Sequence, residues 1–306
     1  MKNHFAILSL VIVVLLGVLG LYFIADIEKG IVNYGSEKED GNSRELKIIA
    51  IEGNPVDQYK QGKILSEERV PPDNETAVKL YTLSAKTGYS SAQNDLGVMF
   101  EKGLGVAKNY KTAVKWYKSS AEQGDANAQH NLAVMCEKGL GIKQDYKTAV
   151  KWYTLAAKQG MVDSQNNLGV IYEKGLDVVQ NYITAVKWYT LAAEQGDATA
   201  QFNLGGMYDE GRGVPKDDKT AMNWYTLAAE QGNVKAQYNL GVMYGKGEGV
   251  LQDNIYAHMW LNIAASYGDR DAIKKRDIVA KTMTTNNISL AQKLDRECVL
   301  KKFKGC

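Results

Sequence analysis

Residues 146–160 read YKTAVKWYTLAAKQG, residues 161–175 read MVDSQNNLGVIYEKG, and this pattern returns every 36 residues along the chain. The five tryptophans keep this period without slippage and are Trp116, Trp152, Trp188, Trp224 and Trp260. A fixed period of this length predicts a solenoid, because one repeat cannot bury its apolar face without stacking on its neighbours.

Each repeat contains two helical segments. In the first, Ala149, Trp152 and Tyr153 fall on one face at about 100° per residue, and Gly160 ends the helix. The second runs from about residue 163 to 174 and carries Gly169, where the other repeats also have glycine or alanine. A small residue there predicts a tight helix crossing. We expect first helices near 75–87, 111–123, 147–159, 183–195, 219–231 and 255–267, and second helices near 91–102, 127–138, 163–174, 199–210 and 235–246.

The loop after each second helix carries two further signals. A glycine recurs in it, except that Asp177 stands at this position in one repeat. Asp tolerates positive φ better than most residues, so we expect the turn to survive. An Asn or Asp then precedes every first helix and is predicted to cap it. These capping residues are Asn109, Asp145, Asn181, Asp217 and Asp253.

The N-terminus carries a long apolar run. Residues 5–24 contain no charge, and about 20 residues at 1.5 Å each match the thickness of a bilayer core. Lys2 precedes the run and Asp26 and Glu28 follow it, so the rest of the chain is expected to face outward, into the periplasm of a bacterium. A cleaved signal peptide of a secreted protein is the alternative. We favour a retained single-pass anchor in the inner membrane, because the run is long and Phe23 suits a cleavage site poorly.

These signals predict an all-α chain in four parts. Residues 1–25 are the anchor or signal segment, 26–72 a linker, 73–268 a solenoid of about six repeats, and 269–306 a C-terminal cap. The final helix is expected from 288 to 303. The net charge of +2 gives no indication of a nucleic-acid partner.

The repeats resemble the Sel-1-like repeat family, a relative of tetratricopeptide repeats. The resemblance lies in AVKWYTLAAEQG followed by AxAQxNLGxMYxxGxGV and covers residues 75 to 268. It implies an α/α superhelix whose concave surface binds proteins or peptides, and adaptor or scaffold roles, often in bacterial envelopes. Some cysteine-rich members are linked to penicillin binding and hydrolysis. This chain has one repeat cysteine, Cys136, so that function loses most of its support.

Two columns of side chains on the first helices are candidates for partner binding. One consists of lysines and the other of threonines; the residues are Lys115, Lys151, Lys187, Thr154, Thr190 and Thr226. The geometry of the resembling family places this face in the concave groove, where it would receive an acidic or carboxylate-bearing peptide. The alternative is a solvated face, since adjacent repeats lie about 10 Å apart, close to the Debye length.

The tryptophan series also has two interpretations. Stacking against sugars is one, and packing in the core of each repeat is the other. We favour the core, because a buried aromatic ring removes about 150–250 Å² from water.

No group of residues predicts chemistry. The three histidines, His4, His130 and His258, are far apart in the repeat register and lack zinc-ligand spacing, so we expect no metal, cofactor or catalytic site. Cys298 and Cys306 are predicted to form a disulfide if the chain is exported. The sequence thus favours a non-catalytic scaffold that binds a protein or peptide; the alternatives are a β-lactam or cell-wall hydrolase and a secreted effector.

Overall fold

The computed structural model describes residues 53–68 and 71–306. The chain divides into two compact units, Met1–Ile51 and Glu52–Cys306, and the description concerns the second. The predicted anchor and most of the predicted linker lie outside the described residues. Among the described helices, none is both long and apolar enough to cross a bilayer.

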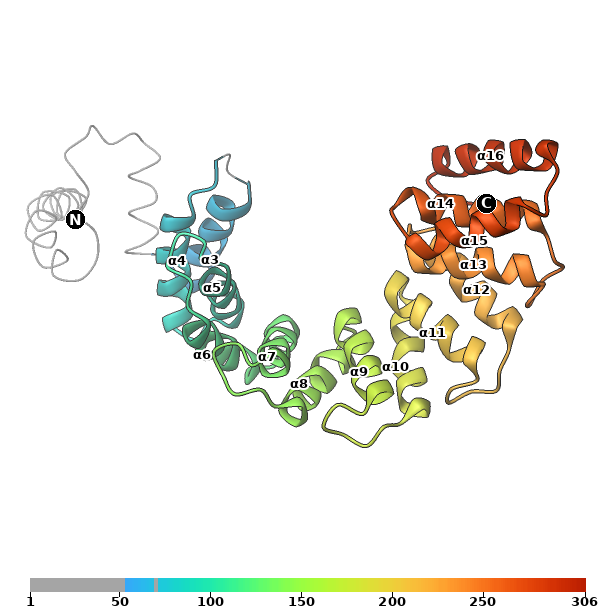
Figure 1. Cartoon of the computed structure of the whole chain (residues 1–306). Coiled ribbons are helices and arrows are strands. Elements are labelled where there is room, and N and C mark those ends of the chain that lie inside the picture. Colours follow the sequence, from blue (N-terminus) through green and yellow to red (C-terminus); the bar gives the residue numbers. More distant parts are fainter. Residues whose placement is uncertain (1–52, 69–70) are drawn as a thin grey trace, which may run out of the picture. The chain divides into compact units, whose positions relative to one another are not determined.

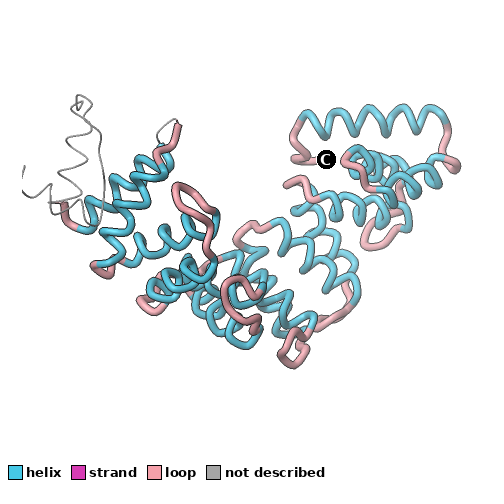
Figure 2. The backbone as a smooth tube through the Cα atoms, turned by 60° about the vertical axis from the view of Figure 1, so that its left-hand side comes forward, coloured by secondary structure: helices cyan, strands magenta, loops and turns pink. Residues whose placement is uncertain are grey.

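The second unit is a row of helices joined by short loops (Figure 1). The tube in Figure 2 contains helices and loops, and the described residues include no strand. The predicted repeat helices are confirmed, and each begins one residue before its predicted start. The first helices are α4 (Asn74–Lys86), α6 (Tyr110–Ala121), α8 (Tyr146–Lys158), α10 (Tyr182–Glu194), α12 (Asp218–Ala229) and α14 (Asn254–Ser266). The second helices are α5 (Ser90–Lys102), α7 (Ala126–Lys138), α9 (Val162–Lys174), α11 (Ala198–Glu210) and α13 (Val234–Lys246).

Capping follows the prediction at the start of each first helix. The Asp145 carboxylate accepts the Thr148 backbone N–H at 3.0 Å, and the other predicted caps bond in the same manner. Asp177 has a φ of 53°, which is the left-handed conformation expected of it. These contacts satisfy N–H groups that a helix leaves unpaired and fix where each loop ends.

Every second helix packs closely on the first helix that follows it. The reason lies at the small residue predicted to mark a crossing: a Cβ on Gly97 would lie 2.6 Å from the Tyr117 ring, and one on Gly205 would lie 2.7 Å from the Tyr225 ring. The absence of a side chain therefore lets a tyrosine ring lie against the helix backbone.

The array begins earlier than predicted. The segment assigned to the linker contains α3 (Pro55–Lys63) and a π-helical turn, η1 (Ile64–Glu68). Asn54 caps α3 and Pro55 opens it, while Gly62 lies against Tyr81 as Gly97 lies against Tyr117. This helix lacks the N-L-G motif of the other second helices, and for that reason the repeat pattern does not detect it.

In the first helices α4 to α12, a recurring tyrosine is the most buried aromatic residue of the helix. Tyr81, Tyr117, Tyr153, Tyr189 and Tyr225 are all at most 2 % exposed. The preceding tryptophans are half-buried in four repeats and pack at the flank of the core, whereas Trp260 is 2 % exposed. The indoles therefore cover the core in most repeats, and the phenol rings fill it.

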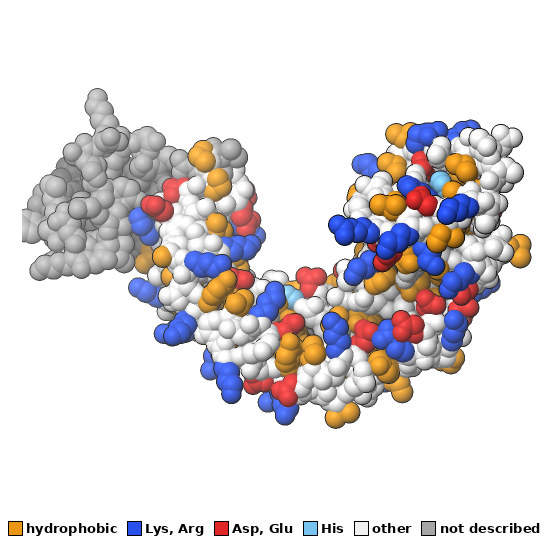
Figure 3. Space-filling view, viewed as in Figure 1, with side chains coloured by type: hydrophobic (Ala, Val, Ile, Leu, Met, Phe, Trp, Pro, Cys, Tyr) orange, Lys and Arg blue, Asp and Glu red, His pale blue; other side chains and the backbone are white. Residues whose placement is uncertain are grey.

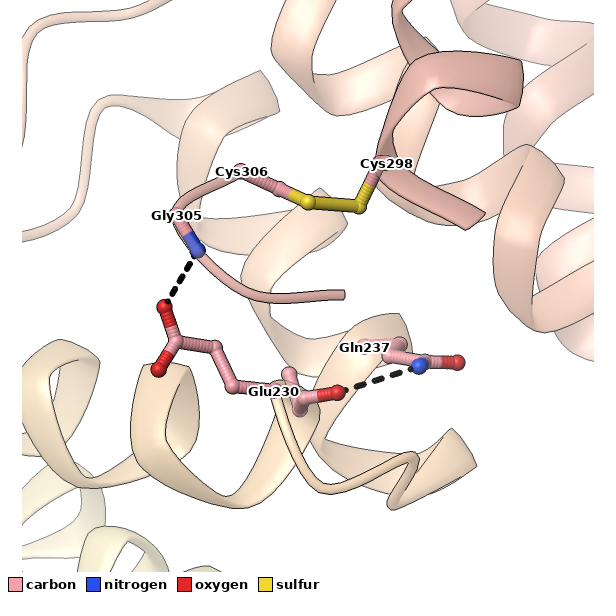
Figure 4. Close-up of a disulfide and its surroundings, with 6 residues drawn as sticks. Glu230, Gln237, Cys298, Gly305 and Cys306 are labelled. Atoms are coloured by element: carbon pink, nitrogen blue, oxygen red, sulfur yellow. Dashed lines mark hydrogen bonds between the residues drawn. A yellow bond between two sulfur atoms is a disulfide. The ribbon is translucent and has the colours of Figure 1, made fainter. Parts of the chain in front are cut away.

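The C-terminal cap consists of α15 (Arg270–Ala280) and α16 (Thr285–Leu300). The final helix begins earlier than predicted, because the Thr284 side chain accepts the Asn287 backbone N–H and caps it. A disulfide joins Cys298 to Cys306 and turns the last residues back (Figure 4). There the Gly305 N–H donates to Glu230 at 3.0 Å, so the tail is fastened to the end of α12.

Candidate partner-binding surface

The three candidate lysines lie on successive first helices. Lys115 is on α6, Lys151 on α8 and Lys187 on α10, and all three are exposed. The lysine column ends at Asn223 on α12, and the next position, Met259, is buried. The lysine column therefore spans α6 to α10 and does not reach α12 or α14.

The candidate threonines are less available to a partner than the lysines. Thr154 donates its hydroxyl to the Val150 carbonyl at 2.7 Å, and Thr190 and Thr226 donate to the carbonyl four residues earlier in the same way. All three are half-buried. Their hydroxyl protons are engaged within their own helix, so they present only an acceptor to a partner.

Sequence reasoning missed a row of exposed leucines beside the lysines. Leu155, Leu191 and Leu227 are 44 %, 45 % and 43 % exposed. Leu155 follows Lys151 by four residues, and Leu191 follows Lys187 likewise, so each pair shares one helix face. Their shared place in the T-L-A-A motif was the available signal. We call these six residues the Lys–Leu strip: Lys115, Lys151, Lys187, Leu155, Leu191 and Leu227.

Partly buried hydrogen bonds join the helices that carry this strip to the second helices before them. The Tyr153 hydroxyl donates to Glu137 at 2.5 Å, and Tyr189 donates to Glu173 at 2.6 Å. Burial, followed by the neighbouring carboxylate, raises the pKa of both phenols above the ordinary value. Such charge-assisted bonds are stronger than neutral ones and link each first helix to the preceding second helix.

The raised phenol pKa values predict alkaline sensitivity. Burial raises the pKa of Tyr81 to about 12, and the pKa of Tyr189 is raised as well. Above about pH 10, unfolded tyrosines lose protons that the folded state keeps. The stabilisation that the protonated phenols provide is therefore complete below about pH 10. Above this pH, the unfolding free energy declines by up to about 1.4 kcal/mol per pH unit for each buried tyrosine. Urea midpoints between pH 8 and 11 measure this decline.

A single substitution tests whether the phenols cause it. Tyr189→Phe should reduce the decline of the unfolding free energy with pH by up to the contribution of one proton, about 1.4 kcal/mol per pH unit. Glu173 keeps its 2.7 Å hydrogen bond to Arg212 in this variant. An unchanged slope in this variant would assign the alkaline sensitivity to other groups.

A chain of glutamine side chains joins consecutive repeats. Gln159 donates to the Gln129 side chain at 2.8 Å, and Gln129 donates to the Ala121 carbonyl. The pattern recurs in four junctions and stops at Gln237, whose Oε1 has no hydrogen-bond partner. The reason is that Tyr267 occupies the position where glutamine would complete the next junction.

The described part of the chain contains one histidine–serine contact and one free cysteine, and neither Ser164 nor Cys136 is exposed. It holds no group of three residues suited to a metal ion. His130 Nδ1 lies 2.8 Å from the Ser164 hydroxyl, but Ser164 is fully buried and out of reach of a substrate. Cys136 is buried, and this burial raises the pKa of its thiol.

Comparison with known proteins supports the repeat assignment. The Sel1 repeat matches six times, at residues 58–89, 90–125, 126–161, 162–197, 198–233 and 234–269. Each match joins a second helix to the first helix after it, which is the closely packed pair described above. The comparison with curated proteins gives no match.

Two solved structures are similar to this chain at 30 % and 35 % sequence identity. A Sel1 repeat protein from Oxalobacter formigenes is 35 % identical, with a TM-score of 0.63, over 70 % of this chain and 88 % of that one. A protective antigen with an SLR fold, from uropathogenic Escherichia coli, is 30 % identical, with a TM-score of 0.58, over 85 % of this chain. The match spans 64 % of the antigen's own length. The six matched repeats and these two structures show that the chain belongs to the Sel1 repeat family.

Proposed function

We propose that this protein is a non-catalytic scaffold that binds a protein or peptide along the Lys–Leu strip. The observation that carries the proposal is the repeated pairing of an exposed leucine with a lysine four residues earlier, on α8 and α10. Apolar side chains that stay exposed in register on a rigid face are typical of contact sites. Sel1 repeats generally mediate protein interactions.

The chemistry of the strip indicates what kind of partner it accepts. Leucine contacts favour an apolar anchor, while the lysines beside them favour carboxylates and disfavour basic segments. The partner is therefore an apolar segment flanked by Asp or Glu.

The second part of the proposal concerns location. Residues 5–24 anchor the chain in the inner membrane, and the repeats face the periplasm. The apolar run supports the anchor, and a Cys298–Cys306 disulfide suits an oxidising compartment. Mass measurement of the mature N-terminus distinguishes this arrangement from a secreted protein whose signal has been removed.

Site-specific photocrosslinking in the native cell tests the strip. A photoreactive residue replaces Leu191 in one variant and, as the control, Val179 in another; Val179 is 87 % exposed on the loop before α10. We expect a discrete crosslinked partner from position 191 and none from 179. The double variant Lys115→Glu, Lys151→Glu should reduce that product about tenfold, because two attractive contacts become repulsive.

Two results would reject the proposal. Equal crosslinking at both positions would mean that the strip does not select a partner. A product unaffected by the lysine changes would exclude the lysines from the binding site. Turnover of nitrocefin or muropeptides by the purified chain would instead support the hydrolase alternative.

A further inference from the structure

The C-terminal cap carries a net charge opposite to that of the rest of the chain. Residues 269–306 hold ten basic and five acidic side chains, which gives +5, whereas residues 1–268 hold 27 basic and 30 acidic ones, which gives −3. Adding Glu230, which accepts the Gly305 N–H, and the carboxylate of Cys306 still leaves the cap at +3. Figure 3 shows lysine and arginine side chains, with hydrophobic ones among them, over the C-terminal helices. The cap therefore favours an anionic partner.

The loop closed by the disulfide, residues 298–306, carries much of this charge, and we call it the tail loop. It contains no acidic side chain and three lysines, which are Lys301, Lys302 and Lys304. All three are exposed, and within the described residues none of them forms an ion pair. Three other basic residues of the cap do pair with acids, namely Lys274, Arg276 and Lys293. The lysines of the tail loop are therefore available to a partner.

Inward contacts hold the tail loop against the array. Cys298 is 3 % exposed, and Phe303 and Cys306 pack on the core cluster that α12, α13 and α14 form. Lys302 and Phe303 both adopt the left-handed conformation, with φ values of 53° and 67°. The chain therefore turns sharply between an exposed lysine and a packed ring, and the fixed side of the loop keeps the other side turned toward solvent.

Aliphatic side chains are exposed beside these lysines. Leu300 is 83 % exposed and Val299 is 46 % exposed, although both directly follow the buried Cys298. Lysines next to exposed aliphatic side chains are typical of surfaces that bind at a bilayer interface. A lysine carries a point charge on a flexible stem, which suits a fluid array of lipid headgroups better than one fixed carboxylate.

We infer that the tail loop binds the surface of an anionic phospholipid bilayer. Leu300 and Val299 enter the boundary between headgroups and acyl chains, and the three lysines lie at the level of the lipid phosphates. The disulfide and the Phe303 ring hold the loop in the shape that presents both kinds of side chain together. This attachment requires neither the Lys–Leu strip nor the N-terminal anchor, so it goes beyond the proposed function.

Quenching of tryptophan emission by brominated lipid tests this inference. Leu300→Trp adds an indole to the tail loop, and the full chain is incorporated into vesicles of phosphatidylglycerol and phosphatidylcholine, with and without bromine on the acyl chains. The matched control is Leu251→Trp, because Leu251 is 89 % exposed on the loop before α14. We expect bromine to quench the emission added by Leu300→Trp at least twofold more than the emission added by Leu251→Trp.

A second set of variants tests the charge. Each lysine beside an anionic bilayer strengthens attachment roughly fivefold. Replacing all three lysines of the tail loop with glutamine in the Leu300→Trp chain should therefore abolish most of the quenching. The control replaces three other exposed lysines in the same way and should keep it; these are Lys138, Lys143 and Lys147.

Four results would overturn the inference. Three of them are quenching no stronger for Leu300→Trp than for Leu251→Trp, equal quenching in vesicles of phosphatidylcholine alone, and equal loss in the two lysine variants. The fourth is relief of the quenching by polyglutamate at a charge concentration well below that of the lipid, which would assign the tail loop to an acidic protein. Failure of the crosslinking test at Leu191 would change none of these results, so the two proposals fail independently.

Discussion

Gly205→Leu is expected to destabilise the array by about 3 kcal/mol, at the upper end of what overpacking a core costs. A Cβ at Gly205 would lie 2.7 Å from the Tyr225 ring and 3.3 Å from the Ala221 carbonyl oxygen. Tyr225 is 2 % exposed and has no room to withdraw. The leucine must therefore separate α11 from α12 and break the contact that holds the pair together.

The neighbouring residue supplies a matched control for this substitution. A Cβ at Gly206 would meet only the Tyr225 hydroxyl, at 3.6 Å, which is an ordinary contact. Gly206→Leu should leave stability unchanged or raise it by up to about 1 kcal/mol, because leucine favours the helix. Urea unfolding followed by circular dichroism measures both variants. Similar losses at the two positions would show that the tyrosine contact is not what requires glycine.

Gly213→Asp is expected to cost about 3 kcal/mol or more, whereas Asp177→Gly should raise stability by up to about 1 kcal/mol. The two residues occupy the same loop position in different repeats, with φ values of 73° and 53°. A Cβ at Gly213 would lie 2.5 Å from the Tyr182 carbonyl carbon, so its replacement adds a collision with backbone to the conformational cost.

Thermal unfolding of both single variants and of the double variant checks this pair. The swap conserves composition and net charge, so any net loss measures the difference between the two loops. If Gly213→Asp were as stable as the parent chain, the close approach of loop and backbone would be disproved.

The sequence was sufficient to predict the structural features that recur in every repeat. The helix starts, the Asp145-type caps and the small residue at Gly97 and Gly205 recur at the same register, and each has a local physical cause that one repeat already contains. The structure confirms them, and it also confirms the left-handed conformation of Asp177.

Hydrogen bonds between side chains on two different helices were not predicted. The bond from Tyr153 to Glu137 joins residues on successive helices, and no pattern within either helix reveals it. Helix α3 was not predicted for a related reason: Gly62 marks a helix contact only through the Tyr81 ring that lies against it. The helical wheel also placed Trp152 and Tyr153 on one broad face without separating the buried ring from the half-buried one.

The glutamine chain has a consequence for how the length of such a protein changes. Each bond runs in the same direction and joins residues 30 positions apart, as from Gln159 to Gln129 and from Gln231 to Gln201. Duplicating or deleting one whole unit by recombination recreates the same glutamine-to-glutamine bond at the new junction. Growth by internal duplication therefore preserves the glutamine chain, whereas a unit added after Tyr267 would not extend it, because tyrosine there supplies no amide donor to Gln237.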